Sequence, residues 1–188
     1  MRVAIAILSI WCGVLSAAGS VRFELRDTNG TVHTASEWQG KKAVVLFFTM
    51  TDCPLANGYV PEMNRLRAAN ESRGVAFYAV QSDNTASDAA VRKYAQEFQY
   101  SFPMLNDPRL TLARLTGATV TPEVAVLSPK GEVLYLGRID NKVEDLTHPR
   151  YAATEPELRN ALDAVLAGKA PKEARTRAVG CSINLESK

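Results

Sequence analysis

Residues 42–63, KAVVLFFTMTDCPLANGYVPEM, join a continuous apolar run to a polar turn that carries one cysteine. Residues 43–48 have the length and the β-branched and aromatic content of a strand buried on both faces. Pro54 suits the first turn of a helix, so Cys53 is predicted to lie at the junction between the strand and a following helix. The unpaired N–H groups and the dipole of a helix N-terminus stabilise an anion, which makes such a thiol a better nucleophile.

This junction resembles the active site of thioredoxin-fold proteins. After the turn Thr51-Asp52-Cys53-Pro54-Leu55-Ala56, Pro61 stands at the offset where the first helix of that family carries a proline. Thr121-Pro122 resembles the family's cis-proline loop, and residues 23–48 are similar to the opening of redoxin and AhpC/TSA-like domains. The resemblance implies an α/β thioredoxin-like fold, with a central mixed β-sheet flanked by helices, an N-terminal hairpin and a C-terminal tail.

The N-terminus has the pattern of a secretory signal peptide. An apolar run over residues 3–15 follows a basic residue and precedes small residues that end at Ala18. Removal of residues 1–18 would leave a thioredoxin-like domain over residues 19–168 and a tail over residues 169–188. The run is too short for a stable membrane span, so we expect a periplasmic or secreted protein, with an uncleaved anchor as the alternative.

Composition gives no reason to expect a nucleic-acid or membrane partner. The chain has 188 residues, 46% of them hydrophobic, which suits one domain with a substantial core. Its formal net charge is only +2, so no strongly basic surface is expected. Cys53 and Cys181 remain after loss of the signal segment, and an oxidising compartment would permit a disulfide between them.

Periodicity and turn residues predict the remaining elements. Asp107 is expected to cap a helix that begins at Pro108, with Leu115 facing inward. Thr154 and Glu157 have the spacing of a capping box before the last helix. The expected elements are a hairpin within residues 21–34, strands at 43–48, 75–80, 123–127 and 132–139, and helices following Cys53, over 85–98, after Pro108 and up to Gly168.

The family's usual second cysteine is missing. Thioredoxins place it three residues after the first, where this chain has Ala56. A resolving thiol must therefore come from Cys181, from another protein or from a small thiol. The buried acid that many thioredoxins keep six residues before the cysteine is Phe47 here, so no proton acceptor is evident at that position.

Two other activities of this fold fit the residues less well. Peroxiredoxins place a threonine or serine three residues before the attacking cysteine and a proline four residues earlier, where this chain has Met50 and Leu46. A thiol peroxidase is therefore the alternative enzyme, with weak or absent turnover expected. Copper chaperones of the Sco type need a cysteine at Asn57 and a distant histidine, for which His148 is available.

No metal site and no cofactor is expected. One cysteine and one histidine supply too few soft ligands for a dedicated copper site. His148 is interpreted as an ordinary loop residue, and His33 as a solvated strand residue.

We therefore expect an exported thiol-disulfide oxidoreductase or redoxin with Cys53 as nucleophile and Cys181 as candidate resolving cysteine. The expected partners are a thiol or disulfide substrate protein or a small thiol reductant. A noncatalytic binding module with a structural disulfide between the two cysteines is the alternative from another class. The residues expected to shape the substrate-binding surface are Thr121, Pro122, Thr51, Asp52 and Pro54.

Two structural expectations follow. The Thr121-Pro122 bond is expected to be cis, with the Thr121 backbone free to pair with an extended substrate. The tail is expected to fold back so that Cys181 reaches Cys53, because thirteen extended residues after Gly168 can span up to roughly 45 Å. Val179 and Ile183 would seat it, while residues 169–177 stay in solvent.

Overall fold

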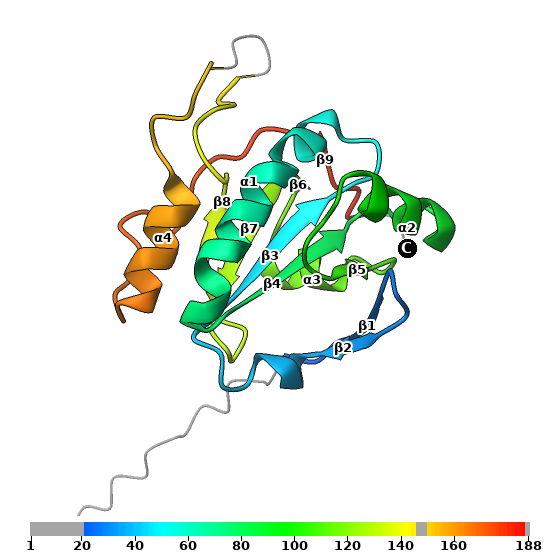
Figure 1. Cartoon of the computed structure of the whole chain (residues 1–188), viewed down its shortest axis with the longest axis horizontal. Coiled ribbons are helices and arrows are strands. Elements are labelled where there is room, and N and C mark those ends of the chain that lie inside the picture. Colours follow the sequence, from blue (N-terminus) through cyan, green and yellow to red (C-terminus); the bar gives the residue numbers. More distant parts are fainter. Residues whose placement is uncertain (1–20, 146–149, 187–188) are drawn as a thin grey trace, which may run out of the picture.

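A seven-stranded mixed sheet forms the centre of the molecule (Figure 1). The computed structural model describes residues 21–145 and 150–186; the expected signal segment, residues 1–18, and His148 lie outside the described residues. The strands are β1 (Glu24–Asp27), β2 (Val32–Thr34), β3 (Ala43–Thr49), β4 (Val75–Gln81), β5 (Met104–Asn106), β6 (Val120–Thr121), β7 (Glu123–Leu127), β8 (Val133–Gly137) and β9 (Cys181–Ser182).

Four α-helices and two short 3-10 helices accompany these strands in the described residues. The α-helices are α1 (Pro54–Asn70), α2 (Asp88–Glu97), α3 (Thr111–Thr116) and α4 (Glu157–Leu166), and the 3-10 helices are η1 (Ala35–Trp38) and η2 (Glu71–Arg73). The order across the sheet is β2-β1-β5-β4-β3-β7-β8, and β6 pairs with β9 in a separate two-stranded sheet. The predicted α/β fold with an N-terminal hairpin is confirmed.

The strand before the cysteine lies at the middle of the sheet, as its composition predicts. All seven residues of β3 are buried. It runs parallel to β4 and antiparallel to β7, so both of its edges are hydrogen-bonded and both of its faces are covered. A strand in this setting needs apolar side chains on both faces, which accounts for its unbroken apolar sequence.

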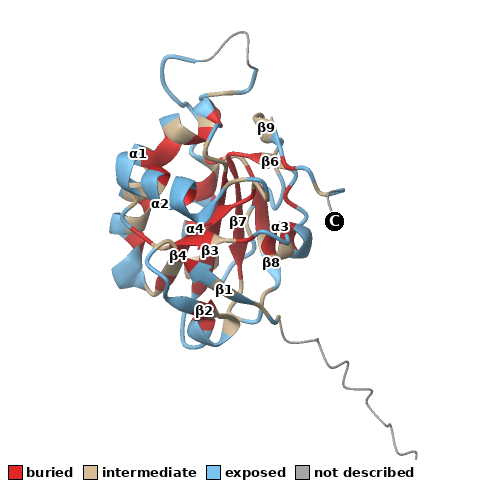
Figure 2. Ribbon diagram, turned by 90° about the vertical axis from the view of Figure 1, so that its right-hand side faces the viewer, coloured by how far each residue is buried: buried red, intermediate tan, exposed pale blue. Residues whose placement is uncertain are grey.

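Successive side chains of β3 enter two different apolar clusters. Val45 and Phe47 join the cluster on the face covered by α1, α2 and α4, whereas Leu46 and Phe48 join the cluster on the α3 face. Figure 2 shows these two helical layers on opposite sides of the buried strands. Trp38 lies fully buried in the second cluster.

His33 is not the solvated residue predicted from its place in a hairpin. Its side chain is buried beneath the hairpin, with Nδ1 2.8 Å from a Glu37 oxygen and Nε2 3.3 Å from an Asp27 oxygen. Tyr78 also donates to Glu37. The prediction was wrong because two acidic side chains meet the imidazole, Asp27 from the neighbouring strand β1 and Glu37 from η1.

The helix after Asp107 begins later than predicted. Asp107 does accept hydrogen bonds from the N–H groups of Thr111 and Leu112, but the residue before the helix is Leu110, in the left-handed region with φ of 54°. Pro108 therefore lies in a turn and not at the first helical position. Leu115, expected to face inward, is 39% exposed because the helix is short and only one side of it meets the sheet.

The capping box before the last helix does not form. Asn141 lies buried in the preceding loop and holds this segment: its Oδ1 accepts from the N–H groups of Thr154 and Glu155, and its Nδ2 donates to the Thr154 hydroxyl. Glu157 pairs instead with Arg138. A tertiary contact has replaced the local one because both members of the predicted box find partners on the loop after β8.

We predict that Asn141→Ala lowers the free energy of unfolding by about 1 to 3 kcal/mol, because it removes the hydrogen bonds that the buried Asn141 side chain makes with Thr154 and Glu155. Chemical denaturation of reduced protein measures the change. Asn160→Ala on α4 is the matched control, since Asn160 is exposed and alanine favours a helix. An equal effect of the two substitutions would contradict the role assigned to Asn141.

Candidate active site

Cys53 occupies the N-cap position of α1, and Pro54 is the first residue of that helix, as predicted. The Cys53 N–H donates to the Met50 carbonyl across the turn that follows β3. The turn after the central strand thus places the Cys53 sulfur at the N-terminus of a 17-residue helix, which is the positive end of the helix dipole. Pro61 lies inside the same helix, at the position expected from the resemblance.

The loop before β7 faces this cysteine. The Thr121-Pro122 peptide bond is cis, which confirms that expectation. The Cys53 Sγ donates to the Thr121 carbonyl oxygen over 3.1 Å. Residues separated by 68 positions in the chain therefore meet at the carboxyl end of β3.

The tail crosses the edge of the sheet before it reaches the site, so its first part is more than a solvated linker. The Leu136 N–H donates to the Ala174 carbonyl, and the Thr176 N–H donates to the Leu136 carbonyl. A Cβ on Gly137 would lie 2.1 Å from the Thr176 hydroxyl oxygen, so this close approach requires glycine. The expectation that residues 169–177 remain in solvent holds for their charged side chains and fails for their backbone.

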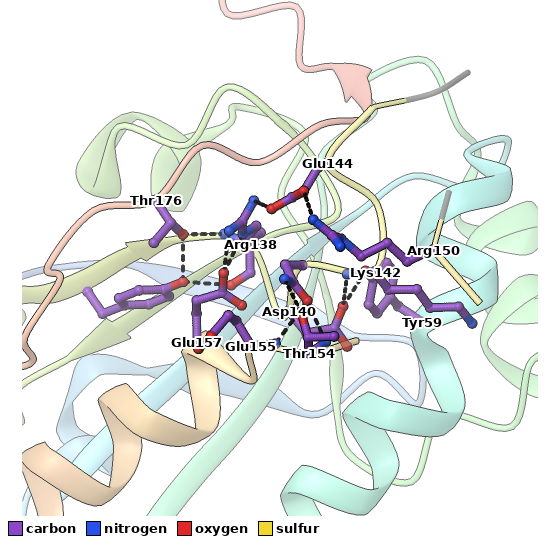
Figure 3. A network of polar contacts seen from close by, with 12 residues as sticks. Tyr59, Arg138, Asp140, Lys142, Glu144, Arg150, Thr154, Glu155, Glu157 and Thr176 are labelled. Atoms are coloured by element: carbon purple, nitrogen blue, oxygen red, sulfur yellow. Dashed lines mark hydrogen bonds and ion pairs between the residues drawn. The ribbon is translucent and has the colours of Figure 1, made fainter. Parts of the chain in front are cut away.

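A polar network fixes the tail at Thr176 (Figure 3). The Thr176 hydroxyl lies 2.7 Å from the Tyr135 hydroxyl and accepts from the Arg138 N–H over 3.0 Å. The Arg138 guanidinium pairs in turn with Glu157 at the start of α4 and with Glu144 in the loop. The base of the tail is therefore tied to both β8 and the last helix.

Beyond this anchor the tail forms β9, which pairs antiparallel with β6. Cys181 lies opposite Thr121 and Ser182 opposite Val120, and the Ile183 N–H donates to the Thr119 carbonyl over 2.8 Å. Figures 1 and 2 both show β9 beside β6. The expectation that the Thr121 backbone is free for an extended substrate is therefore wrong for this state, because the chain's own tail occupies it.

This pairing brings the two sulfur atoms together. The Sγ atoms of Cys181 and Cys53 are 2.6 Å apart, although the residues are separated by 128 positions. Both are free cysteines in the structure. The expected reach of Cys181 to Cys53 is confirmed, and of its two predicted seating residues Ile183 is buried while Val179 is partly exposed.

The two thiols differ in exposure and in acidity. Cys53 is completely buried beneath the tail, whereas Cys181 is partly exposed. Burial opposes ionisation of Cys53, but hydrogen bonds from the Cys181 side chain and from the N–H of Ala56 lower its pKa below the ordinary value. Burial, the adjacent Cys53 and the negative charge of Asp52 raise the pKa of Cys181 to about 12. Cys53 is thus the more acidic of the two thiols.

A hydroxyl network near Cys53 was not anticipated from the sequence. The Thr49 hydroxyl lies 2.9 Å from the Tyr94 hydroxyl and 3.2 Å from the Tyr100 hydroxyl, and Tyr94 donates to the Asn57 side chain over 2.8 Å. Burial raises the pKa of both tyrosines, and negative charge on Cys53 adds to the shift. The sequence clue was Asn57 itself, one turn after the cysteine.

The other predicted site residues lie around the sulfurs. Thr51 and Asp52 form the turn before Cys53, and Asp52 is exposed. Pro54 is exposed and lines a groove between the first turns of α1 and the loop after β8. Aromatic and apolar residues dominate the wall opposite the helix, including Val143, Tyr151, Ala152, Ala153 and Pro156.

Metal ligands do not gather in the described part of the chain. Within residues 21–145 and 150–186, no three His, Cys, Asp or Glu side chains lie together in a way that could hold a metal ion. Over the same residues, no helix has the length and apolar character needed to cross a membrane.

A mixed sheet, a cysteine at the N-terminus of the first helix and a cis-proline loop opposite it define a thioredoxin-fold protein. A model of the AhpC/TSA family matches residues 19–136. The chain therefore belongs to the AhpC/TSA family, as the resemblance implied.

Relatives and solved structures agree with this placement. The thiol-disulfide oxidoreductase ResA of Halalkalibacterium halodurans is 27% identical over 136 residues, covering 70% of this chain and 76% of the relative. An uncharacterized conserved protein from Geobacillus kaustophilus matches with a TM-score of 0.75 and 28% identity, over 87% of this chain and 88% of that one. A putative thiol:disulfide interchange protein DsbE from Chlorobium tepidum, with a TM-score of 0.58 and 21% identity over 79% of this chain and 93% of that one, shares the fold.

We predict that the pKa of Cys53 is lower than that of an ordinary cysteine. Replacing Cys181 with alanine should raise this pKa, because one hydrogen bond to the Cys53 thiolate is lost. Cys181→Ser keeps a hydroxyl donor and should restore a lower pKa. Thiolate absorbance as a function of pH, taken as the difference from the matching Cys53→Ser protein, measures this. Identical pKa values in the alanine and serine variants would show that the Cys181 side chain does not stabilise the thiolate.

Proposed function

We propose that this protein is an exported thiol-disulfide oxidoreductase whose redox couple consists of Cys53 and Cys181. The observation that carries the proposal is the 2.6 Å contact between a low-pKa sulfur at a helix N-terminus and a higher-pKa sulfur on the tail. Thiolate attack and internal resolution need these two properties at this distance. The 27% identity to the oxidoreductase ResA supports the same activity.

The proposed cycle balances as a two-thiol exchange. The Cys53 thiolate attacks one sulfur of a partner disulfide, forms a mixed disulfide and releases the other sulfur as a thiolate, which takes a proton from solvent. Cys181, once deprotonated, attacks the Cys53 Sγ and releases the second partner sulfur. The partner disulfide is reduced to two thiols, and the protein is left with a Cys53–Cys181 disulfide that an external thiol must reduce.

Export is part of this proposal. The pattern of residues 1–18 supports it, and one solved structure of the same fold is described as a secreted disulfide oxidoreductase of Mycobacterium tuberculosis. An oxidising compartment would sustain cycling between the dithiol and the disulfide.

The same contact could also serve a structural disulfide in a noncatalytic binding module. The acidity of the buried sulfur favours the enzyme, because a purely structural half-cystine gains nothing from stabilisation of its thiolate. Rapid exchange at Cys53 therefore separates the two functions.

We predict that Cys53→Ser abolishes catalysed disulfide reduction, while Cys181→Ser retains the first exchange and accumulates a mixed disulfide. The physical reason is that Cys53 supplies the attacking thiolate, whereas Cys181 acts only in the second step. Turnover of a protein disulfide and mass mapping of the trapped adduct measure the two effects. Equal loss of the first exchange in both variants, or full turnover without Cys181, would contradict the assignment.

We also predict that reduced protein consumes hydrogen peroxide no faster than a free thiol of similar pKa. Met50 and Leu46 provide neither of the peroxide-binding side chains of peroxiredoxins, and the nearby Thr49 hydroxyl is already bonded to Tyr94 and Tyr100. Without donors aimed at the peroxide, its cleavage gains little electrostatic help. Stopped-flow measurement of peroxide loss tests this, and a markedly faster reaction would establish the peroxidase instead.

A further inference from the structure

The segment that covers Cys53 belongs to the chain itself, and its contacts are those of a bound extended peptide. Residues 180–183, here called the Cys181 segment, follow the edge of β6 with Cys181 opposite Thr121. Main-chain hydrogen bonds of this kind bind any extended strand, while the alternate side chains give selectivity. The Cys181 segment places its own sulfur on Cys53, where the proposed function requires a partner sulfur.

We propose that the Cys181 segment is an internal copy of the substrate, and that this site accepts extended protein segments with glycine directly before the reacting cysteine and an apolar residue two positions after it. The inference rests on the proposed function and names the substrate class of the same site. A partner segment of this kind displaces the Cys181 segment from β6 before it meets Cys53.

The glycine requirement comes from the closeness of the two backbones. A Cβ on Gly180 would lie 1.9 Å from the Thr121 carbonyl oxygen and 2.6 Å from its carbonyl carbon. These are backbone atoms of the cis-proline loop, and the loop is held by β6 on one side and by β7 on the other. Any larger residue before the cysteine must therefore push the strand away from Thr121.

The apolar requirement comes from Ile183. Its side chain is 6% exposed and joins the apolar cluster on the α3 face, which includes Leu112 and Ala118. Its N–H also donates to the Thr119 carbonyl, so its position on the strand is fixed. Between the cysteine and this residue, Ser182 is exposed and should tolerate substitution.

Displacement is required because Cys53 has no exposed surface while the Cys181 segment is docked. The base of the tail remains tied at Thr176, so only the residues beyond it need to move. When a partner cysteine takes the place of Cys181, the Cys53 thiolate attacks that cysteine's sulfur in the partner disulfide, and the other partner sulfur leaves as a thiolate. Return of the Cys181 segment then brings the resolving sulfur back to the mixed disulfide.

The test uses full-length protein with both Cys12→Ser and Cys181→Ser, so that Cys53 is its one thiol. The substrate is the peptide AVGCSINL, the sequence of residues 178–185, with its cysteine in a disulfide to thionitrobenzoate. Release of the coloured thiolate reports exchange at Cys53. Peptides with glycine changed to valine or isoleucine changed to aspartate should react at least about tenfold more slowly, whereas serine changed to valine, the matched control, should react like the parent.

A second measurement examines the docked segment in the whole protein. In reduced Gly180→Val protein the added side chain cannot fit against Thr121, so alkylation of Cys53 at alkaline pH, mapped by mass spectrometry, should rise at least about tenfold over wild type. Ser182→Val, an exposed neighbour, should leave Cys53 protected. Alkaline pH keeps the thiolate fraction from limiting the comparison.

The outcomes separate this inference from the proposed function. Equal rates for all four peptides would overturn the inference, and so would unchanged protection of Cys53 in Gly180→Val protein. The proposed function would still stand in either case if Cys53 exchanges with a small aromatic disulfide. No exchange of Cys53 with that small disulfide in Gly180→Val protein, where the segment is displaced, would overturn the proposed function and the inference together.

Discussion

The antiparallel pairing of Cys181 with Thr121 is the contact on which the site depends. It places the tail sulfur on Cys53, buries the nucleophile and occupies the edge of the cis-proline loop. Two glycines make it sterically feasible, Gly137 at the edge of β8 and Gly180 against Thr121. Since these approaches involve backbone atoms, side-chain rearrangement alone could not accommodate a larger residue at either position.

The site is electrostatically asymmetric because the two sulfurs have different surroundings. Cys53 receives hydrogen bonds from the first turn of α1 and from the tail, whereas Cys181 is close to Cys53 and to the negative charge of Asp52. The asymmetry makes the buried Cys53 the more acidic thiol. In a disulfide between them, Cys53 is accordingly the better leaving group when an external thiol attacks Cys181.

A second cysteine on the tail differs physically from one placed a single turn along the helix. Linking residues 128 positions apart would stabilise the fold by about 5 kcal/mol on the chain-entropy model, far more than a bond within one helical turn. It also couples redox state to access, because the resolving residue belongs to the segment that covers the nucleophile. Oxidation would therefore strengthen a closure to which backbone pairing and the burial of Ile183 already contribute.

The sequence by itself determined the buried strand, the helix that begins at Pro54, the position of Cys53 between them and the family, because each depends on local periodicity or on residues close together in the chain. It also showed that Cys181 had the reach. The tertiary structure decided what the tail does there: it pairs with Thr121, which no local pattern in residues 169–188 indicates. Likewise His33, Asn141 and Thr49 take partners brought from elsewhere in the fold, and such contacts become visible only when distant segments are packed together.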